Sequence, residues 1–160
     1  MTKDTGVAIQ SNALLGKRVL LAISGGIAAV ESVKLARELR RHQADLTVIM
    51  SEEATKIITP LAVSWGSDTT VHHGWNPQMS QLDGFDLTLI APATRTTISK
   101  HIHGIMDSPL MMALSAGRGQ NSKLCFVPSM HSDLFDDPVT NDLLDALQKE
   151  GSHVILNKVD

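Results

Sequence analysis

Small polar residues and glycines follow four short apolar runs of the chain. Ser24-Gly25-Gly26 follows the first run, Ser51 follows the second, and hydroxyl-bearing segments at 92–97 and 128–133 follow the third and fourth. Glycines let a ligand approach the backbone closely, and a helix that starts after such a turn offers N–H groups and a positive dipole end to a phosphate. Four such segments together favour one shared site for a phosphate-bearing ligand.

Each segment taken alone also has an ordinary structural interpretation. The Ser-Gly-Gly turn at 24–26 matches neither the G-x-G-x-x-G fingerprint nor a Walker A loop, and it fits a plain strand-to-helix turn equally well. Ser51 stands before two glutamates, as is typical of a helix N-cap. The threonines at 94–97 can cap a helix, bind an anion, or do both.

The histidines and the single cysteine suggest little metal or thiol chemistry. His101 and His103 lie two residues apart on an expected helix, so they point to different faces and cannot chelate a metal together; we predict no metal site. His131 follows the fourth run, where it either contacts substrate or is an ordinary loop residue. Cys125 lies inside that run, where a buried and inert thiol is expected.

The elements that must position these residues alternate between strand and helix. Short apolar runs predict strands at 18–24, 45–50, 86–91, 123–127 and 153–156. Amphipathic or capped segments predict helices at 27–42, from 51 onward, and at 94–103, 111–116 and 141–150. This alternation predicts an α/β fold with one doubly wound parallel sheet, Rossmann-like or flavodoxin-like, whose ligands bind at the carboxyl ends of the strands.

The length of 160 residues fits one domain. We expect residues 1–15 to form an N-terminal arm and residues 16–160 to form the domain. Residues 60–85 are rich in Gly, Pro, Ser, Asp and His, and we expect a long connection there that is functional or mobile.

Composition excludes several classes of partner. A net charge of −3 with 19% charged residues argues against nucleic acid and against an anionic membrane surface. No apolar run approaches the roughly 20 residues of a membrane-spanning helix. A single cysteine excludes an intrachain disulfide, which makes a reducing cytoplasm the default location. With 3% aromatic residues, a planar ligand must be held mostly by backbone and aliphatic groups.

Five segments, in this order and spacing, resemble the flavin-containing cysteine decarboxylases. That family includes phosphopantothenoylcysteine decarboxylase and the enzymes that decarboxylate C-terminal cysteines of peptide antibiotics, and the resemblance runs from about 17 to 155. The segments are Ser24-Gly-Gly-Ile-Ala-Ala29, Met50-Ser-Glu-Glu-Ala-Thr55 with Thr59-Pro60, Asp86-Leu-Thr-Leu-Ile-Ala-Pro-Ala-Thr94, Gly104-Ile-Met-Asp-Ser-Pro109 and Pro128-Ser-Met-His131.

The resemblance implies a site for FMN. Thr94 and Thr97 take the first and last places of the family's Ser-Ala-Asn-Thr flavin element, whereas Arg95 and Thr96 depart from its two middle places. Arg95 either brings positive charge near the ligand or projects to solvent or a neighbouring subunit. The residues assigned to FMN are Ser24, Gly25, Gly26, Ile27, Ser51, Pro92, Ala93, Thr94, Thr96, Thr97 and Ser129. Met130 and His131, in the family's Pro-x-Met-Asn motif, are assigned to the substrate.

The resemblance also implies oxidative decarboxylation of a cysteinyl group, at a peptide C-terminus or in phosphopantothenoylcysteine. A family histidine assists as acid or base, but its position here is Gln78, which cannot titrate. His73 or His72 would serve only if the loop is rearranged, and no cysteine corresponds to the family's C-terminal flap cysteine. Two alternatives are an FMN-dependent oxidoreductase acting on another small substrate, and a flavin-binding or regulatory subunit without decarboxylase activity.

The resemblance implies a homo-oligomer, a trimer or an assembly of trimers. Family flavin sites lie at subunit interfaces, so a neighbouring subunit would supply the aromatic cover that this chain lacks.

Overall fold

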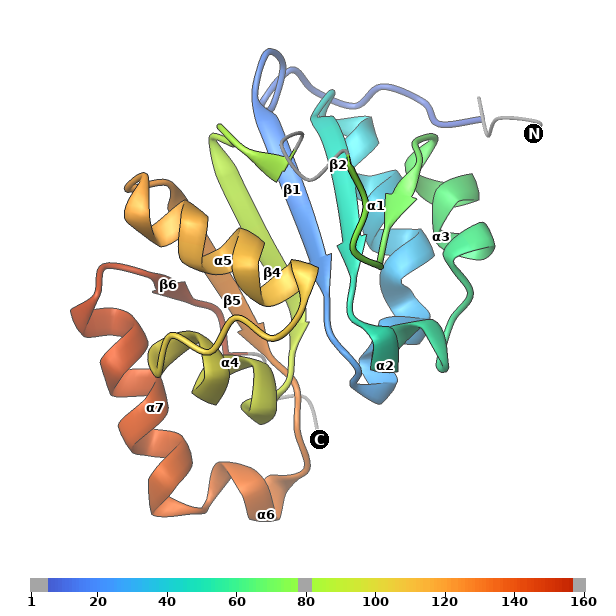
Figure 1. Cartoon of the computed structure of the whole chain (residues 1–160). Coiled ribbons are helices and arrows are strands. Elements are labelled where there is room, and N and C mark those ends of the chain that lie inside the picture. The colour runs from blue at the N-terminus through green and yellow to red at the C-terminus, as the bar shows by residue number, and fades with distance from the viewer. Residues whose placement is uncertain (1–5, 78–81, 157–160) are drawn as a thin grey trace.

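One parallel sheet of six strands, in the order β3-β2-β1-β4-β5-β6, forms the centre of the computed structural model, which describes residues 6–77 and 82–156 (Figure 1). The strands are β1 (Arg18–Ile23), β2 (Asp45–Met50), β3 (Val71–His72), β4 (Leu87–Ala93), β5 (Lys123–Pro128) and β6 (His153–Val154). Every neighbouring pair is parallel, which confirms the predicted fold class. The strand order reverses between β1 and β4, and ligands of such sheets bind at this switch point.

Helices cover both faces of the sheet. They are the 3-10 helix η1 (Ile27–Glu31) and the α-helices α1 (Ser32–Arg41), α2 (Glu52–Thr55), α3 (Pro60–Ser67), α4 (Arg95–Ile102), α5 (Pro109–Gly119), α6 (Ser132–Phe135) and α7 (Pro138–Lys149). The helices α1 and α3 lie on one side, and α4, α5 and α7 lie on the other (Figure 1). Within the described residues, no helix combines the length and the apolar character needed to cross a membrane.

The sheet is buried on both faces, which explains the continuous apolar runs of its central strands. In β1, Leu20 and Ala22 belong to the core beneath α4, α5 and α7, whereas Leu21 and Ile23 belong to the core beneath α1 and α3. All four side chains are at most 1% exposed. Because side chains alternate along a strand, a single run supplies both cores.

The prediction of one long connection at 60–85 was wrong. It contains α3, whose N-cap is Thr59 and whose first residue is Pro60. It also contains β3, which pairs with β2. The small buried residues of α3 conceal its helical pattern: a Cβ added at Gly66 would lie 2.9 Å from Val33. In β3 only Val71 is apolar, and His72, His73 and Gly74 follow it, so no apolar run marks this strand.

The helix predicted at 27–42 is divided into η1 and α1. A 3-10 turn winds more tightly than an α-turn and therefore changes which residues face the sheet. Ile27 is 77% exposed and Val30 is 49% exposed, although both are apolar residues of the amphipathic helix predicted at 27–42. The buried residue of η1 is Ala29.

The described part of the N-terminal arm, residues 6–15, packs on the end of α1. The amides of Gln10 and Leu14 donate to the carbonyls of Arg41 and His42, at 2.9 Å each. The Ser11 hydroxyl lies 2.6 Å from His42 Nδ1. These contacts satisfy carbonyls that the end of a helix leaves without an intrahelical donor.

Candidate functional site

A cavity of about 190 Å³ lies beside the switch point of the sheet, and we call it the cap cavity. It is lined by Gly25, Ser51, Glu53, Thr94, Thr96, Thr97, Lys100, Ser108, Leu110 and Met111. The structure therefore brings together five residues that the sequence assigned to the cofactor: Gly25, Ser51, Thr94, Thr96 and Thr97.

Three helices begin at the cap cavity. Ser51 Oγ accepts a hydrogen bond from Ala54 N at 3.1 Å, and Thr94 Oγ1 accepts one from Thr97 N at 3.2 Å. Ser108 Oγ caps α5 by accepting from Met111 N at 3.3 Å. Each N-terminus carries a partial positive charge, so three of them directed to one cavity favour an anion.

The hydroxyls of the cap cavity still have protons to offer. Ser51 and Ser108 act as acceptors in these caps, and neither hydroxyl donates to an acceptor among the described residues. Thr94 Oγ1 instead donates to Thr97 Oγ1 at 3.0 Å.

Lys100 is the cation of the cap cavity. Its Nζ lies 2.8 Å from Asp107 Oδ2, and this hydrogen bond holds the pKa of Asp107 below its usual value. Glu53, an exposed residue, lines the same cavity. Hydroxyls, helix N-termini and one ammonium are the donors that bind phosphate, so these residues fit the phosphate end of FMN.

Ser24 positions the cavity and does not line it. It is fully buried; its hydroxyl donates to the Pro92 carbonyl at 2.5 Å and accepts from Thr94 N at 2.9 Å. These bonds join the end of β1 to the end of β4. Ala93 is buried and Ile27 points outward, and neither lines the cap cavity. Their contact with a cofactor stays a prediction.

A second cavity, of about 340 Å³, is bounded by η1 and α1 on one side and by the ends of β4 and β5 on the other. We call it the helix-side cavity. It contains Pro92, Ser129 and Met130 of the predicted site. His131 does not line it: its side chain is 75% exposed, and its Nδ1 accepts from Asp133 N at 3.4 Å to cap α6.

His72 and His73 line a third and larger cavity, of about 850 Å³, with Arg18, Thr47 and Trp75 among its other residues. It shares no lining residue with the cap cavity. Burial, and then the nearby charge of His73, lower the pKa of His72. Gln78, at the position of the family histidine, lies outside the described residues.

Arg95 is paired within the chain. Its guanidinium forms an ion pair with Asp137, the N-cap of α7. The hydrogen bond from Val139 N, followed by the one from Arg95, lowers the pKa of Asp137. Arg95 therefore fastens α4 to α7 and does not line the cap cavity.

Cys125 is buried, as predicted, and burial raises the pKa of its thiol. A thiol held protonated in this way is a poor nucleophile. In the described ranges, no group of three or more His, Cys, Asp or Glu side chains is arranged to hold a metal ion.

Sequence reasoning missed Glu53, Lys100 and Ser108 as cavity residues. Ser108 could have been recognised from the sequence, because a Ser-Pro pair is typical of the N-cap and first position of a helix. The predicted helix instead began at Met111. Lys100 follows Thr97 by three residues, which places the two on one face of α4.

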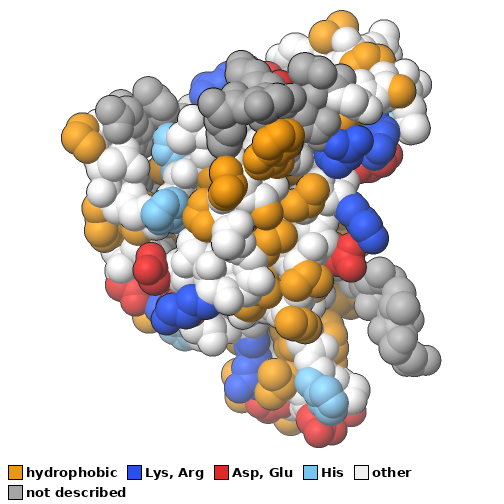
Figure 2. All heavy atoms as spheres, turned by 90° about the vertical axis from the view of Figure 1, so that its right-hand side faces the viewer, with side chains coloured by type: hydrophobic (Ala, Val, Ile, Leu, Met, Phe, Trp, Pro, Cys, Tyr) orange, Lys and Arg blue, Asp and Glu red, His pale blue; other side chains and the backbone are white. Residues whose placement is uncertain are grey.

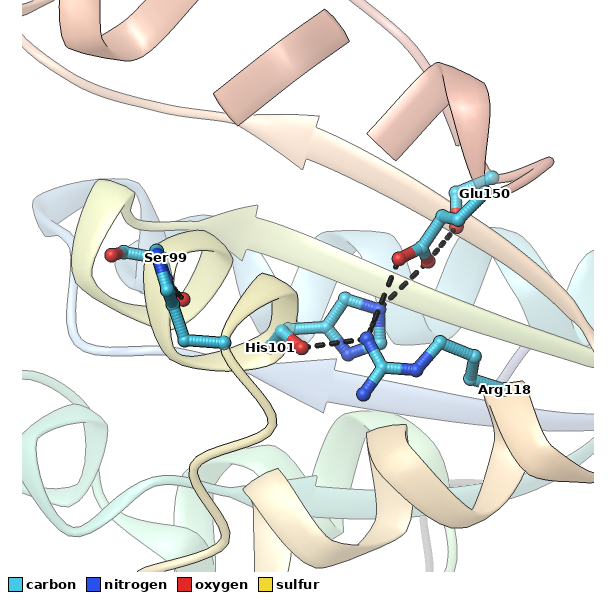
Figure 3. A network of polar contacts seen from close by, with 6 residues as sticks. Ser99, His101, Arg118 and Glu150 are labelled. Atoms are coloured by element: carbon cyan, nitrogen blue, oxygen red, sulfur yellow. Dashed lines mark hydrogen bonds and ion pairs between the residues drawn. The ribbon is translucent and has the colours of Figure 1, made fainter. Parts of the chain in front are cut away.

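A buried polar network anchors the other end of α4 (Figure 3). His101 is fully buried, and its Nε2 donates to Glu150 Oε2 at 2.8 Å. Arg118 of α5 donates to the His101 carbonyl at 2.6 Å and lies 3.4 Å from Glu150 Oε1. Glu150 is the C-cap of α7, so the network joins α4, α5 and α7. The core on this face of the sheet contains Leu110 and Met111, which also line the cap cavity.

The chain is similar to known proteins of one family. Residues 7–159 match the model of the family described as Flavoprotein. Among curated relatives, the coenzyme A biosynthesis bifunctional protein CoaBC of Thermococcus kodakarensis is 38% identical over 162 residues. That alignment covers 92% of this chain and 38% of the relative. CoaBC of Methanocaldococcus jannaschii is 35% identical, over 79% of this chain and 32% of the relative. The chain thus spans less than two-fifths of either relative.

Solved structures share the fold. The FMN-dependent cysteine decarboxylase SpaF matches with a TM-score of 0.84 at 21% identity, covering 91% of this chain and 87% of SpaF. A C175S mutant of PPC decarboxylase, complexed with pantothenoylaminoethenethiol, matches with a TM-score of 0.74 at 22% identity, covering 87% and 81%. The family match extends over nearly the whole chain, and the chain belongs to the Flavoprotein family.

Proposed function

We propose that the chain binds FMN, with the phosphate in the cap cavity, and decarboxylates a cysteinyl group. The observation that carries the proposal is the meeting of three helix N-caps and Lys100 at one cavity beside the switch point. The cavity of about 190 Å³ is smaller than the roughly 300–1,000 Å³ of whole ligand sites, so it suits the phosphate end and leaves the flavin ring outside.

The residues of the chain supply binding and orientation. The Ser51 and Ser108 hydroxyls would donate to phosphate oxygens, and Lys100 would neutralise part of the phosphate charge. The Ser24 bridge holds the β1 and β4 ends in register, while Pro92 and Met130 border the space for a substrate. The chemistry that bound FMN supplies in this reaction is a two-electron oxidation of the substrate thiolate.

The names of the relatives support the substrate class. The CoaBC proteins are named for coenzyme A biosynthesis, and the fold neighbours include a PPC decarboxylase and FMN-dependent cysteine decarboxylases. The proposed substrate is therefore an amide-linked cysteinyl group, in phosphopantothenoylcysteine or at a peptide C-terminus.

Mass spectrometry tests the activity directly. Flavin-loaded protein is incubated with phosphopantothenoylcysteine and with cysteine-ended peptides. We expect a product that has lost carbon dioxide, with two further hydrogens lost where the oxidised product is released. If every substrate keeps its original mass after incubation with a yellow, flavin-loaded protein, decarboxylation is contradicted.

A second candidate is flavin binding without decarboxylation. It is favoured by Gln78 at the position of the family histidine, together with the location of His72 and His73 in a separate cavity. Replacing Gln78 by His separates the two candidates. Turnover that appears only in Gln78→His supports the second candidate, whereas equal turnover in both proteins supports the first.

We further propose that the chain forms a homo-oligomer, a trimer or an assembly of trimers, in a reducing cytoplasm, which its single cysteine suits. On α3, Leu61 is 60% exposed and Trp65 is 42% exposed, and Figure 2 shows hydrophobic side chains gathered on that side of the molecule. Exposed apolar groups of this kind mark interaction surfaces. Light scattering should give a multiple of the chain mass that Trp65→Glu lowers; a monomeric parent protein would contradict the proposal.

A further inference from the structure

The helix-side cavity has a polar group that nothing in the described chain satisfies. Ser32, the first residue of α1, is 2% exposed and lines this cavity, and its Oγ has no hydrogen-bond partner among the described residues. A helical serine commonly returns its hydroxyl to a carbonyl of the preceding turn, but Ser32 does not. Because buried polar groups are nearly always hydrogen bonded, a partner from outside the described residues is expected.

The rest of the lining sets the chemistry of that partner. Leu35, Ala91, Val127, Met130 and Phe135 make the walls largely apolar. Glu31 is the one charged residue among the described lining residues, and its side chain is 62% exposed. Its contact with Lys34 Nζ, at 3.5 Å, joins two exposed side chains and leaves most of its charge in place. The cap cavity offsets its exposed Glu53 with Lys100, whereas the described lining of the helix-side cavity includes no Lys or Arg. The helix-side cavity therefore suits a neutral or cationic hydrogen-bonding group and disfavours an anion.

The helix-side cavity adjoins the cap cavity. Pro92 lines the first and Thr94 lines the second, two residues apart at the end of β4. Gly26 lies between them: an added Cβ would stand 3.4 Å from Thr94 Cγ2 and 3.7 Å from Pro92 Cγ. A substrate lying in the helix-side cavity is thus beside a cofactor whose phosphate occupies the cap cavity.

We propose that the helix-side cavity binds the amide-linked chain that precedes the reacting cysteinyl group, and that Ser32 is its hydrogen-bonding anchor. Glu31 selects against a negatively charged side chain on the residue that precedes the cysteinyl group. The inference rests on the proposed function, because a cysteinyl substrate places such an amide beside the flavin. An amide of this kind occurs both in peptides and in pantothenoylcysteine.

Binding, and not turnover, tests the proposal. The probes carry serine in place of cysteine and so lack the reactive thiol: N-acetylated tripeptides ending in Ser, and N-pantothenoylserine. Calorimetric titration of flavin-loaded protein measures their affinities. Ser115→Ala is the matched control for Ser32→Ala, because Ser115 Oγ is also buried without a partner among the described residues but belongs to α5 and does not line this cavity.

Ser32→Ala should weaken the better-bound probe about fivefold, as expected for one hydrogen bond, while Ser115→Ala leaves it unchanged. The probe that binds more tightly, either the tripeptide or N-pantothenoylserine, shows which kind of substrate supplies the amide. A tripeptide with Lys before the final Ser should bind about threefold more tightly than one with Glu. Glu31→Gln should abolish this preference, and Glu52→Gln, on exposed α2, should keep it.

Equal affinities in Ser32→Ala and Ser115→Ala, with wild-type turnover intact, would overturn the assignment of the cavity. A partner-subunit side chain filling the cavity in a crystal structure would overturn it as well. Turnover by the wild-type protein is measured before any variant is compared. If that protein binds flavin but decarboxylates no cysteinyl substrate, the proposed function fails.

Discussion

Gly25 and Gly26 are neighbours in the chain, but an added side chain would meet different surroundings at each. A Cβ at Gly25 would lie 2.5 Å from Glu53 Cβ, closer than real side-chain contacts allow. A Cβ at Gly26 would meet its nearest atom at 3.4 Å, an ordinary contact, and neither glycine is among the residues with positive φ. Gly25 is thus required by packing, whereas Gly26 is not.

Gly25→Ala should therefore lower the free energy of unfolding by about 1–3 kcal/mol, the usual cost of overpacking. Gly26→Ala should change it by less than about 0.5 kcal/mol. Urea unfolding of both variants checks this pair, and equal stabilities would contradict it.

Lys100 is the one Lys or Arg among the described residues that line the cap cavity. Replacing it by Gln should weaken FMN about tenfold, which corresponds to roughly 1.4 kcal/mol for one charged hydrogen bond. Lys123→Gln removes the same charge at the start of β5, away from the cavity, and should leave the affinity unchanged. Flavin fluorescence titration measures both. A wild-type affinity in Lys100→Gln would show that its ammonium only serves Asp107.

The lining of the cap cavity could be predicted from sequence where a residue directly follows a strand. Ser51 and Thr94 do so, and the strand pattern alone places them at one edge of the sheet. Lys100 and Ser108 lie farther along the chain and reach the cavity only through the packing of α4 and α5, which no local pattern states. Ser24 has the right position, but its hydroxyl is used by Pro92 and Thr94.

At the scale of elements, α4 is fixed at both ends. Thr94 caps its start at the cap cavity, and His101 joins its end to α5 and α7. Burial lowers the pKa of His101, although its hydrogen bond to Glu150 acts in the opposite direction. Since the Glu150 carboxylate can only accept, Nε2 carries the proton and Nδ1 has no partner among the described residues.

This network should make stability depend on pH. As pH falls below about 6.5, His101 of the unfolded chain takes up a proton that the folded protein resists, so stability is lost. Wild type should be less stable at pH 5.5 than at pH 7.5, and His101→Gln should lose part of that difference. His103→Gln, an exposed change on the same helix end, should keep it. Identical pH slopes in wild type and His101→Gln, measured by urea unfolding, would contradict the account.

A helix or strand was predictable from sequence when its buried apolar residues form a continuous run or recur at a regular spacing. The strands β1, β2, β4 and β5 bury continuous apolar runs and were located within a few residues. The helix α3 buries Ser64 and Gly66 against α1, and β3 has Val71 as its one apolar residue, so neither produced a recognisable pattern.

At the scale of the whole molecule, the sheet order explains why the sequence segments converge. Reversal of the order between β1 and β4 places the loop after β1 and the start of α4 around one opening, where β2 and α5 add Ser51 and Ser108. Alternating strands and helices predicted this parallel sheet, but the two cavities beside the switch point depend on side-chain packing that only the structure shows.

The most direct test of the central claim compares two flavins that differ only in the phosphate. Purified chain, freed of any flavin, is titrated with FMN and with riboflavin while flavin fluorescence is followed. If the cap cavity holds the phosphate, FMN should bind at least about tenfold more tightly than riboflavin, and Lys100→Gln should narrow that difference. Equal affinities for the two flavins, or no binding of FMN, would contradict it.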